Sequence, residues 1–102
     1  TVDHWATDML ARLVIDVAFI GTNGISIEHG LTTPDPAVAA VKRTALGVAR
    51  RRILVAAHSK FGADSFCRFA EVSDFEAIVT GSELSIAEAQ RYEALGPSVV
   101  RA

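Results

Sequence analysis

Two short apolar runs, each followed at once by a polar segment with glycine, most constrain the fold of this chain. The first run, residues 17–20, leads into GTNGIS at residues 21–26, and the second, residues 53–57, leads into HSKFG at residues 58–62. One helical pattern separates the two units. Strands that alternate with helices are typical of a parallel sheet, whose ligand-binding loops gather at the carboxyl ends of its strands. We therefore expect the first loop (residues 21–26) and the second loop (residues 58–62) to lie side by side, as a site for a small anionic molecule.

Composition and charge exclude several classes of protein. Half of the 102 residues are hydrophobic and the mean hydropathy is +0.30, which is too apolar for a disordered chain and fits a single domain. A net charge of -2 disfavours binding to a phosphate backbone by charge. The single cysteine, Cys67, excludes an intrachain disulfide and a cysteine-based metal site and suits a reducing cytoplasm. The sequence shows neither a signal peptide nor an apolar run long enough to cross a bilayer, so we expect a cytoplasmic protein with no membrane partner.

The periodicity of the chain predicts an α/β fold with a mostly parallel sheet and flanking helices. Capping signals mark two of the helices: Asp35 with Pro36 before one, and Ser85 with Glu88 before the other, which Gly96 and Pro97 end. We expect residues 21–34 and 58–69 to form loops, and the arginines at 50–52 to end the second helix, where the helix dipole favours cations. The expected helices cover residues 3–13, 36–49 and 86–95, and the expected strands cover residues 14–20, 53–57, 75–80 and 99–100.

The candidate ligand-binding groups come from both loops. Glycines in the first loop allow a ligand to approach its backbone N–H groups closely, and Thr22, Asn23 and Ser26 add neutral hydrogen-bonding groups. Gly and Asn here would also suit an ordinary turn with positive φ. The chain has only two lysines, and both lie in or beside the loops. Lys60 can meet an anion as a mobile point charge, and Lys42 follows on the intervening helix.

Catalytic and metal chemistry find little support in the sequence. The three histidines have no metal-ligand spacing, and we expect no cofactor. Ser59 beside His58 suggests a nucleophile with a base, but neighbouring residues on a strand point to opposite faces, which disfavours a hydrolase. The loops hold no carboxylate that could act as a base, so we expect no catalytic residue. His58 and Ser59 remain candidates for hydrogen bonds to a ligand.

The ordered string of these segments resembles the C-terminal sensor domain of the DeoR family of bacterial transcriptional repressors. The matching residues are 17–26, 28–36, 40–43 and 58–62, and the likeness extends over nearly the whole chain. The resemblance implies a Rossmann-like half of a fold similar to ribose-5-phosphate isomerase and the CoA-transferases. It also implies a homo-oligomeric, cytoplasmic regulator that senses a phosphorylated sugar or related metabolite, and whose separate winged helix-turn-helix domain binds DNA.

Carried over residue by residue, the resemblance makes Gly21, Thr22, Asn23 and Gly24 the loop beside the sugar. Lys60 would then face the phosphate or hydroxyls, His58 and Ser59 would shape the end of the strand, and Lys42 would approach the same site. The related isomerases carry carboxylates at the first loop, whereas this chain has Gly-Thr-Asn-Gly. The family also often has an acidic residue where this chain has Val38, and aspartate where it has Ala57.

The resemblance further implies that residues 1–102 are the C-terminal part of a sensor domain. The DNA-binding domain and the phosphate-cradling first half of the sensor would lie outside them. Two alternatives stay open from the sequence: an enzyme related to phosphosugar isomerases, and an oligomerisation module that does not bind ligand.

Overall fold

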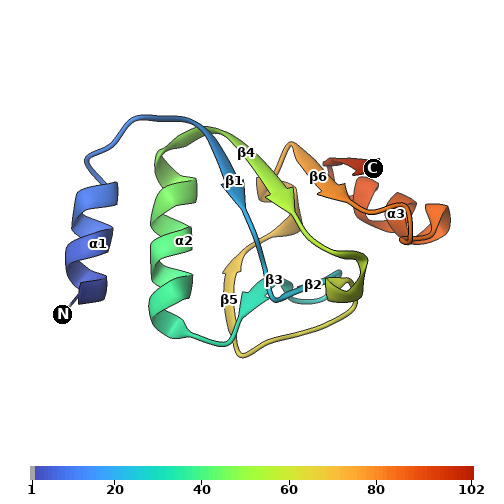
Figure 1. The fold of residues 1–102 in the computed structure, drawn as a ribbon, viewed down its shortest axis with the longest axis horizontal. Helices are drawn as coiled ribbons and strands as arrows, with labels where there is room; N and C mark the ends of the chain where they lie inside the picture. The colour runs from blue at the N-terminus through green and yellow to red at the C-terminus, as the bar shows by residue number, and fades with distance from the viewer. Residues whose placement is uncertain (1) are drawn as a thin grey trace.

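A four-stranded parallel sheet forms the centre of the molecule. The computed structural model describes residues 2–102, and its main sheet has the strand order β1-β4-β6-β7 (Figure 1). All neighbouring strands are parallel, and Ile20 of β1 pairs with Leu54 of β4, which in turn pairs with Ile78 of β6. The predicted α/β class with a mostly parallel sheet is therefore confirmed. The strands are β1 (Ile15–Ile20), β4 (Ala49–Val55), β6 (Ala77–Thr80) and β7 (Ser98–Arg101).

Residues 2–102 form three α-helices, and two of them begin at the predicted caps. α2 (Pro36–Val48) starts after Asp35, whose side chain accepts a hydrogen bond of 2.8 Å from the Ala37 amide. α3 (Ile86–Glu93) starts after Ser85, which accepts from the Glu88 amide at 3.1 Å. Gly96 lies two residues past the C-cap of α3, Ala94, and its φ of 131° is a positive value that favours glycine. The first helix, α1 (Val2–Leu10), packs against α2.

A second, antiparallel sheet occupies segments that the sequence predicted as loops. Its strands are β2 (Gly24–Ser26), β3 (Gly30–Thr33) and β5 (Cys67–Ala70), in the order β2-β3-β5. The prediction failed because every residue of β2 and β3 is buried, so neither strand shows the alternation of apolar and polar residues that marks a half-exposed strand. Two 3₁₀ turns complete the fold, η1 (His58–Lys60) and η2 (Val72–Asp74).

The three consecutive arginines lie in β4 rather than at the end of a helix. Arg51 donates two hydrogen bonds of 2.9 Å to the carboxylate of Glu76. Arg52 donates to the carbonyl oxygen of Asp74 at 2.6 Å and to that of Leu46 at 3.3 Å. The prediction that these arginines end the helix was wrong, although α2 itself ends within one residue of the predicted end and Arg52 still contacts a carbonyl in its last turn.

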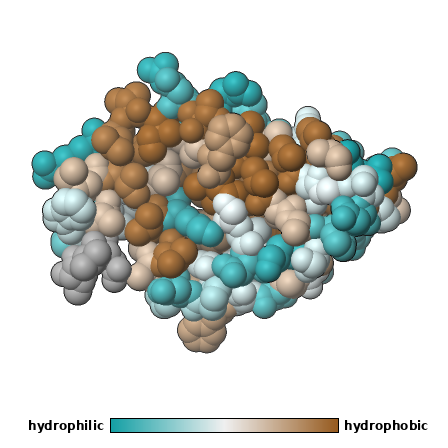
Figure 2. Space-filling model, in the orientation of Figure 1, coloured by the Kyte–Doolittle hydropathy of each residue, from teal (hydrophilic) through white to brown (hydrophobic). Residues whose placement is uncertain are grey.

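The main sheet has one covered face and one open face. Leu54 and Ile78 are fully buried in a core that also takes in Leu31 of the second sheet and Tyr92 of α3. The alternate residues point the other way: Phe19 is 68% exposed and Val55 48% exposed. Figure 2 shows hydrophobic residues gathered over β1 and β4 on this side. Both connecting helices, α2 and α3, thus cover the same face.

Candidate ligand-binding site

The first and second loops meet at the carboxyl edge of the main sheet. Gly21 directly follows β1, and the second loop starts three residues after the end of β4, the strand beside β1. The amide of Gly62 donates a 2.7 Å hydrogen bond to the carbonyl oxygen of Ile25, and Ile25 also forms an isolated parallel bridge with Phe61. The structure therefore brings together the two segments that the sequence singled out.

Polar side chains of the first loop bind the loop to β3. The Thr22 hydroxyl lies 2.8 Å from the carbonyl oxygen of Gly24 and 3.0 Å from that of Thr32. Asn23 accepts a 3.0 Å hydrogen bond from the hydroxyl of Thr33. These groups therefore shape the loop even without a ligand.

The glycines of the first loop do not serve a positive φ. Among residues 2–102, positive φ occurs only at Gly30, Gly62 and Gly96. Gly24 is instead required by close packing, because a Cβ atom there would overlap the carbonyl oxygen of Ala63. This contact joins the first loop to the residue that follows the second loop.

The second loop presents three side chains without internal partners. His58 and Ser59 are exposed and Lys60 is half-buried, in a 3₁₀ turn closed by hydrogen bonds from Lys60 N to Ala57 O and from Phe61 N to His58 O. Within residues 2–102, none of the three side chains forms a hydrogen bond or an ion pair. The turn replaces the strand geometry expected around His58 and Ser59, and no hydrogen bond joins that pair. All three groups are therefore available to a ligand.

Lys42 reaches the first loop from the middle of α2. Its ammonium donates a 2.7 Å hydrogen bond to the carbonyl oxygen of Gly21 and lies 5.0 Å from the centre of the Phe69 ring. Partial burial lowers the pKa of Lys42 below its usual value. The two lysines thus differ: the Lys60 ammonium has no partner in the described part of the chain, whereas Lys42 is held against the loop backbone.

A cluster of Ser26, His29 and Asp64 supports the contact between the two loops. The sequence analysis did not predict this cluster. The buried Ser26 hydroxyl donates to one carboxylate oxygen of Asp64 at 2.6 Å, and Nδ1 of His29 lies 3.1 Å from the other. A nucleophilic serine needs a base to take its proton, with an acidic group orienting that base. Here the carboxylate lies between the two other groups, so the cluster fastens the β2–β3 connection to residue 64. Asp64 is 38 residues from Ser26, and no local pattern links them.

This cluster predicts a loss of stability in acid. The hydrogen bond from Ser26, followed by the contact with His29, lowers the pKa of Asp64 in the folded protein. A lowered pKa stabilises the folded state above the unfolded value of about 3.9, and that contribution disappears as the pH falls through the folded value. Urea unfolding of wild type and Asp64→Asn between about pH 2.5 and 7 should show a stability gap at neutral pH that closes in acid. A gap that stays constant over this range would contradict the prediction.

Tyr92 of α3 supports the contact between the first and second loops. Its ring packs edge-on against Phe61, with centroids 5.0 Å apart, and its hydroxyl donates a 3.3 Å hydrogen bond to the carbonyl oxygen of Ile25. The residue is 1% exposed, and desolvation raises the pKa of its hydroxyl. One side chain thus contacts both loops.

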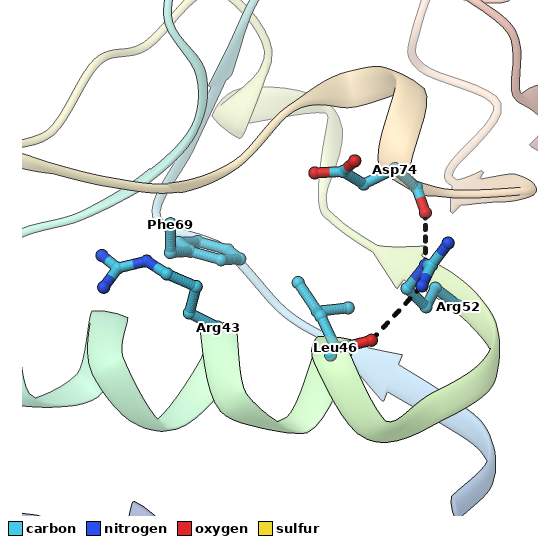
Figure 3. A pocket seen from close by; sticks show the side chains of 6 residues that line it. Arg43, Leu46, Arg52, Phe69 and Asp74 are labelled. Atoms are coloured by element: carbon cyan, nitrogen blue, oxygen red, sulfur yellow. Dashed lines mark hydrogen bonds between the residues drawn. The ribbon is translucent and has the colours of Figure 1, made fainter.

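A cavity of about 220 Å³ lies toward the amino end of β4, away from the end that carries the second loop. Figure 3 shows Arg52 bridging the backbone oxygens of Leu46 and Asp74 there, with the Phe69 ring as an apolar wall. The cavity is lined by Arg43, Leu46, Gly47, Arg52, Phe69 and Asp74. Arg52 uses two of its donors on the protein's own carbonyl groups, so this side chain links α2 to η2 beside the cavity.

Residues 2–102 hold neither a cluster of metal ligands nor a membrane-spanning helix. No group of three or more histidine, cysteine, aspartate or glutamate side chains in this part of the chain could hold a metal ion. No helix among these residues has the length and apolar character needed to cross a bilayer.

Known proteins match this chain along most of its length. Residues 1–82 match the family model for the DeoR C-terminal sensor domain. The HTH-type transcriptional regulator GlpR of Haloferax volcanii is 34% identical over 95 residues, which are 93% of this chain and 37% of that protein. An HTH-type regulator named FruR of Bacillus subtilis is 44% identical over 67% of this chain and 27% of its own length. The HTH-type repressor GlcR of the same organism is 37% identical over 72% of this chain and 28% of its own length.

The chain therefore spans between about a quarter and two-fifths of the length of these relatives. The matched family region contains both loops and the whole of α2, the elements that form the junction described above. These matches show that the chain belongs to the DeoR family of transcriptional regulators and carries the C-terminal sensor domain of that family.

Proposed function

We propose that this domain senses a phosphorylated sugar or a related anionic metabolite, bound at the carboxyl edge of the main sheet. The observation that carries the proposal is the junction of the two loops through Gly62 and Ile25. It holds the exposed residues Gly21 and Asn23 next to a turn with three polar side chains, one of them a lysine, that have no partner among residues 2–102.

The proposed contacts divide by chemistry. Lys60 supplies a positive charge for a phosphate group, since a charge-assisted hydrogen bond is roughly twice as strong as a neutral one. His58 and Ser59 supply neutral donors and acceptors for sugar hydroxyls. The exposed backbone of Gly21 and Asn23 forms the adjoining wall.

The role we propose is regulatory rather than catalytic. Its support is that the Ser26 hydroxyl is buried and donates to a carboxylate whose pKa is lowered, which makes that carboxylate a weak base. The relatives are named transcriptional regulators, one of them a repressor. A phosphosugar isomerase relative and a module that only oligomerises are the competing functions.

The same proposal covers the longer protein. Residues 1–102 would be the C-terminal part of a sensor domain in a cytoplasmic homo-oligomer. Ligand binding would change the DNA affinity of a winged helix-turn-helix domain elsewhere in the polypeptide, since a ligand shifts an equilibrium between two states by its difference in affinity for them.

Calorimetric titration with a panel of sugar phosphates and their unphosphorylated sugars tests the proposal. We expect at least one phosphorylated sugar to bind while its parent sugar does not. Lys60→Met should weaken that binding about tenfold or more, because a hydrogen bond to a charged group contributes about 1.5–3 kcal/mol.

Arg12→Met is the matched control, since this exposed cation lies outside both loops and its loss should leave affinity unchanged. Equal affinity for wild type and Lys60→Met would remove Lys60 from the site. Turnover of a sugar phosphate by the purified protein would favour the isomerase, and an oligomer that shows no heat with any of the compounds would favour the oligomerisation module.

A further inference from the structure

Lys42 carries a half-buried positive charge that no carboxylate among residues 2–102 offsets. Its ammonium contacts the carbonyl oxygen of Gly21 at 2.7 Å and the face of the Phe69 ring at 5.0 Å, and both partners are neutral. No acidic side chain in the described part of the chain comes within ion-pair distance of it. By contrast, Arg51, Arg68 and Arg91 each pair with a glutamate.

Such an ammonium has unused capacity for an anion. It has three N–H donors, one of which is engaged by Gly21. Transfer of a charge out of water is costly unless an opposite charge compensates it, and burial accordingly lowers the pKa of this lysine. Gly21 is itself exposed, so a ligand at the first loop can approach the ammonium along the same edge.

We propose that the bond between Lys42 and Gly21 is a latch that the anionic group of the ligand opens. This inference rests on the function proposed above and adds how that site responds to its ligand. In the free protein the ammonium holds the end of β1 against α2. When a phosphate or carboxylate arrives, the ammonium leaves the neutral carbonyl for the anion, because opposite charges attract more strongly than a charge and a neutral carbonyl group do.

The latch connects the site to the helices. Gly21 begins the loop whose next residues, Thr22 and Asn23, hydrogen-bond to Thr32 of β3. Lys42 lies on α2, which packs against α1. Transfer of the ammonium therefore removes a direct hydrogen bond between the ligand loop and α2, and the loop becomes freer to move relative to both helices.

The chain's two lysines make the latch directly observable. Protein labelled with ¹³C at the lysine ε carbon gives two signals, and Lys60→Met assigns them. Titration with the sugar phosphate that gives heat, and with inorganic phosphate as a second probe, should move the Lys42 signal. Hydrogen exchange at the Asn23 and Gly24 amides should become faster with sugar phosphate bound.

Two variants separate the latch from a structural role. Lys42→Met keeps the length of the side chain but loses the charge, so it should weaken binding about tenfold or more and should speed exchange at Asn23 and Gly24 even without ligand. Lys42→Arg keeps the charge and should recover most of the affinity. Arg12→Met should change neither readout.

The outcomes distinguish this inference from the proposal on which it rests. If wild type binds a sugar phosphate and Lys42→Met binds it equally well, the latch is wrong while the ligand site stands. A Lys42 signal that stays in place while the Lys60 signal moves would likewise overturn the latch and leave the ligand site standing. If no sugar phosphate produces heat with wild type, both proposals fail.

Discussion

Gly24→Ala should lower the free energy of unfolding by about 3 kcal/mol, since overpacking a tightly packed site costs about 1–3 kcal/mol and backbone atoms cannot rotate away. The added Cβ would overlap the carbonyl oxygen of Ala63 and would lie 2.9 Å from the Thr32 hydroxyl. To relieve the overlap, β2 and the residues after the second loop must move apart. Urea unfolding followed by circular dichroism measures the change, and we expect ligand affinity to fall with it.

Gly47→Ala is the matched control for that substitution. Gly47 lies in α2, and a Cβ placed there would meet no atom within 4 Å. Alanine in a helix is favoured over glycine by about 0.5–1 kcal/mol, so this variant should be as stable as wild type or more stable. Equal free energies of unfolding for Gly24→Ala and Gly47→Ala would show that the backbone near Ala63 can move away at little cost. That result would contradict tight packing between the two loops.

Tyr92→Ala should destabilise the protein by about 3–5 kcal/mol, the range found when a large buried aromatic side chain is truncated. Tyr92 is 1% exposed and packs against Phe61, so its loss leaves a cavity beneath both loops. Thermal unfolding and urea unfolding both measure the effect.

Tyr92→Phe divides that loss into its parts. It keeps the ring against Phe61 and removes only the hydrogen bond to Ile25, whose carbonyl still accepts from Gly62. The cost should be about 1 kcal/mol, the usual net value of one hydrogen bond. If the phenylalanine variant lost as much stability as the alanine variant, the hydrogen bond and not the packing would dominate.

The sequence predicted the main sheet because its strands and caps are local patterns. Ile53 and Leu54 form part of a continuous apolar run, and Asp35 and Ser85 are helix caps readable within about four residues. The juxtaposition of the two loops followed from the parallel arrangement of β1 and β4. Each of these inferences needs only residues close together in the sequence and the rule that strands joined by a helix are usually parallel neighbours in one sheet.

What supports the site could not be predicted, since it depends on contacts between distant residues. Ser26 and Asp64 are 38 positions apart, and Tyr92 and Ile25 are 67 apart. The short strand β2 has no exposed face to reveal its period. The sequence marked Lys42 and Lys60 as the two cations of the site, but only the structure distinguishes the lysine held by Gly21 from the one in the exposed turn.

The position of Tyr92 also affects where the sensor domain ends. The family model stops at residue 82, before α3, yet the ring and hydroxyl that support both loops come from α3. A boundary drawn at the end of the family model would thus separate the ligand loops from the helix that supports them. The smallest unit that can keep the loops in place therefore extends through α3, and shortened forms meant for binding studies should retain it.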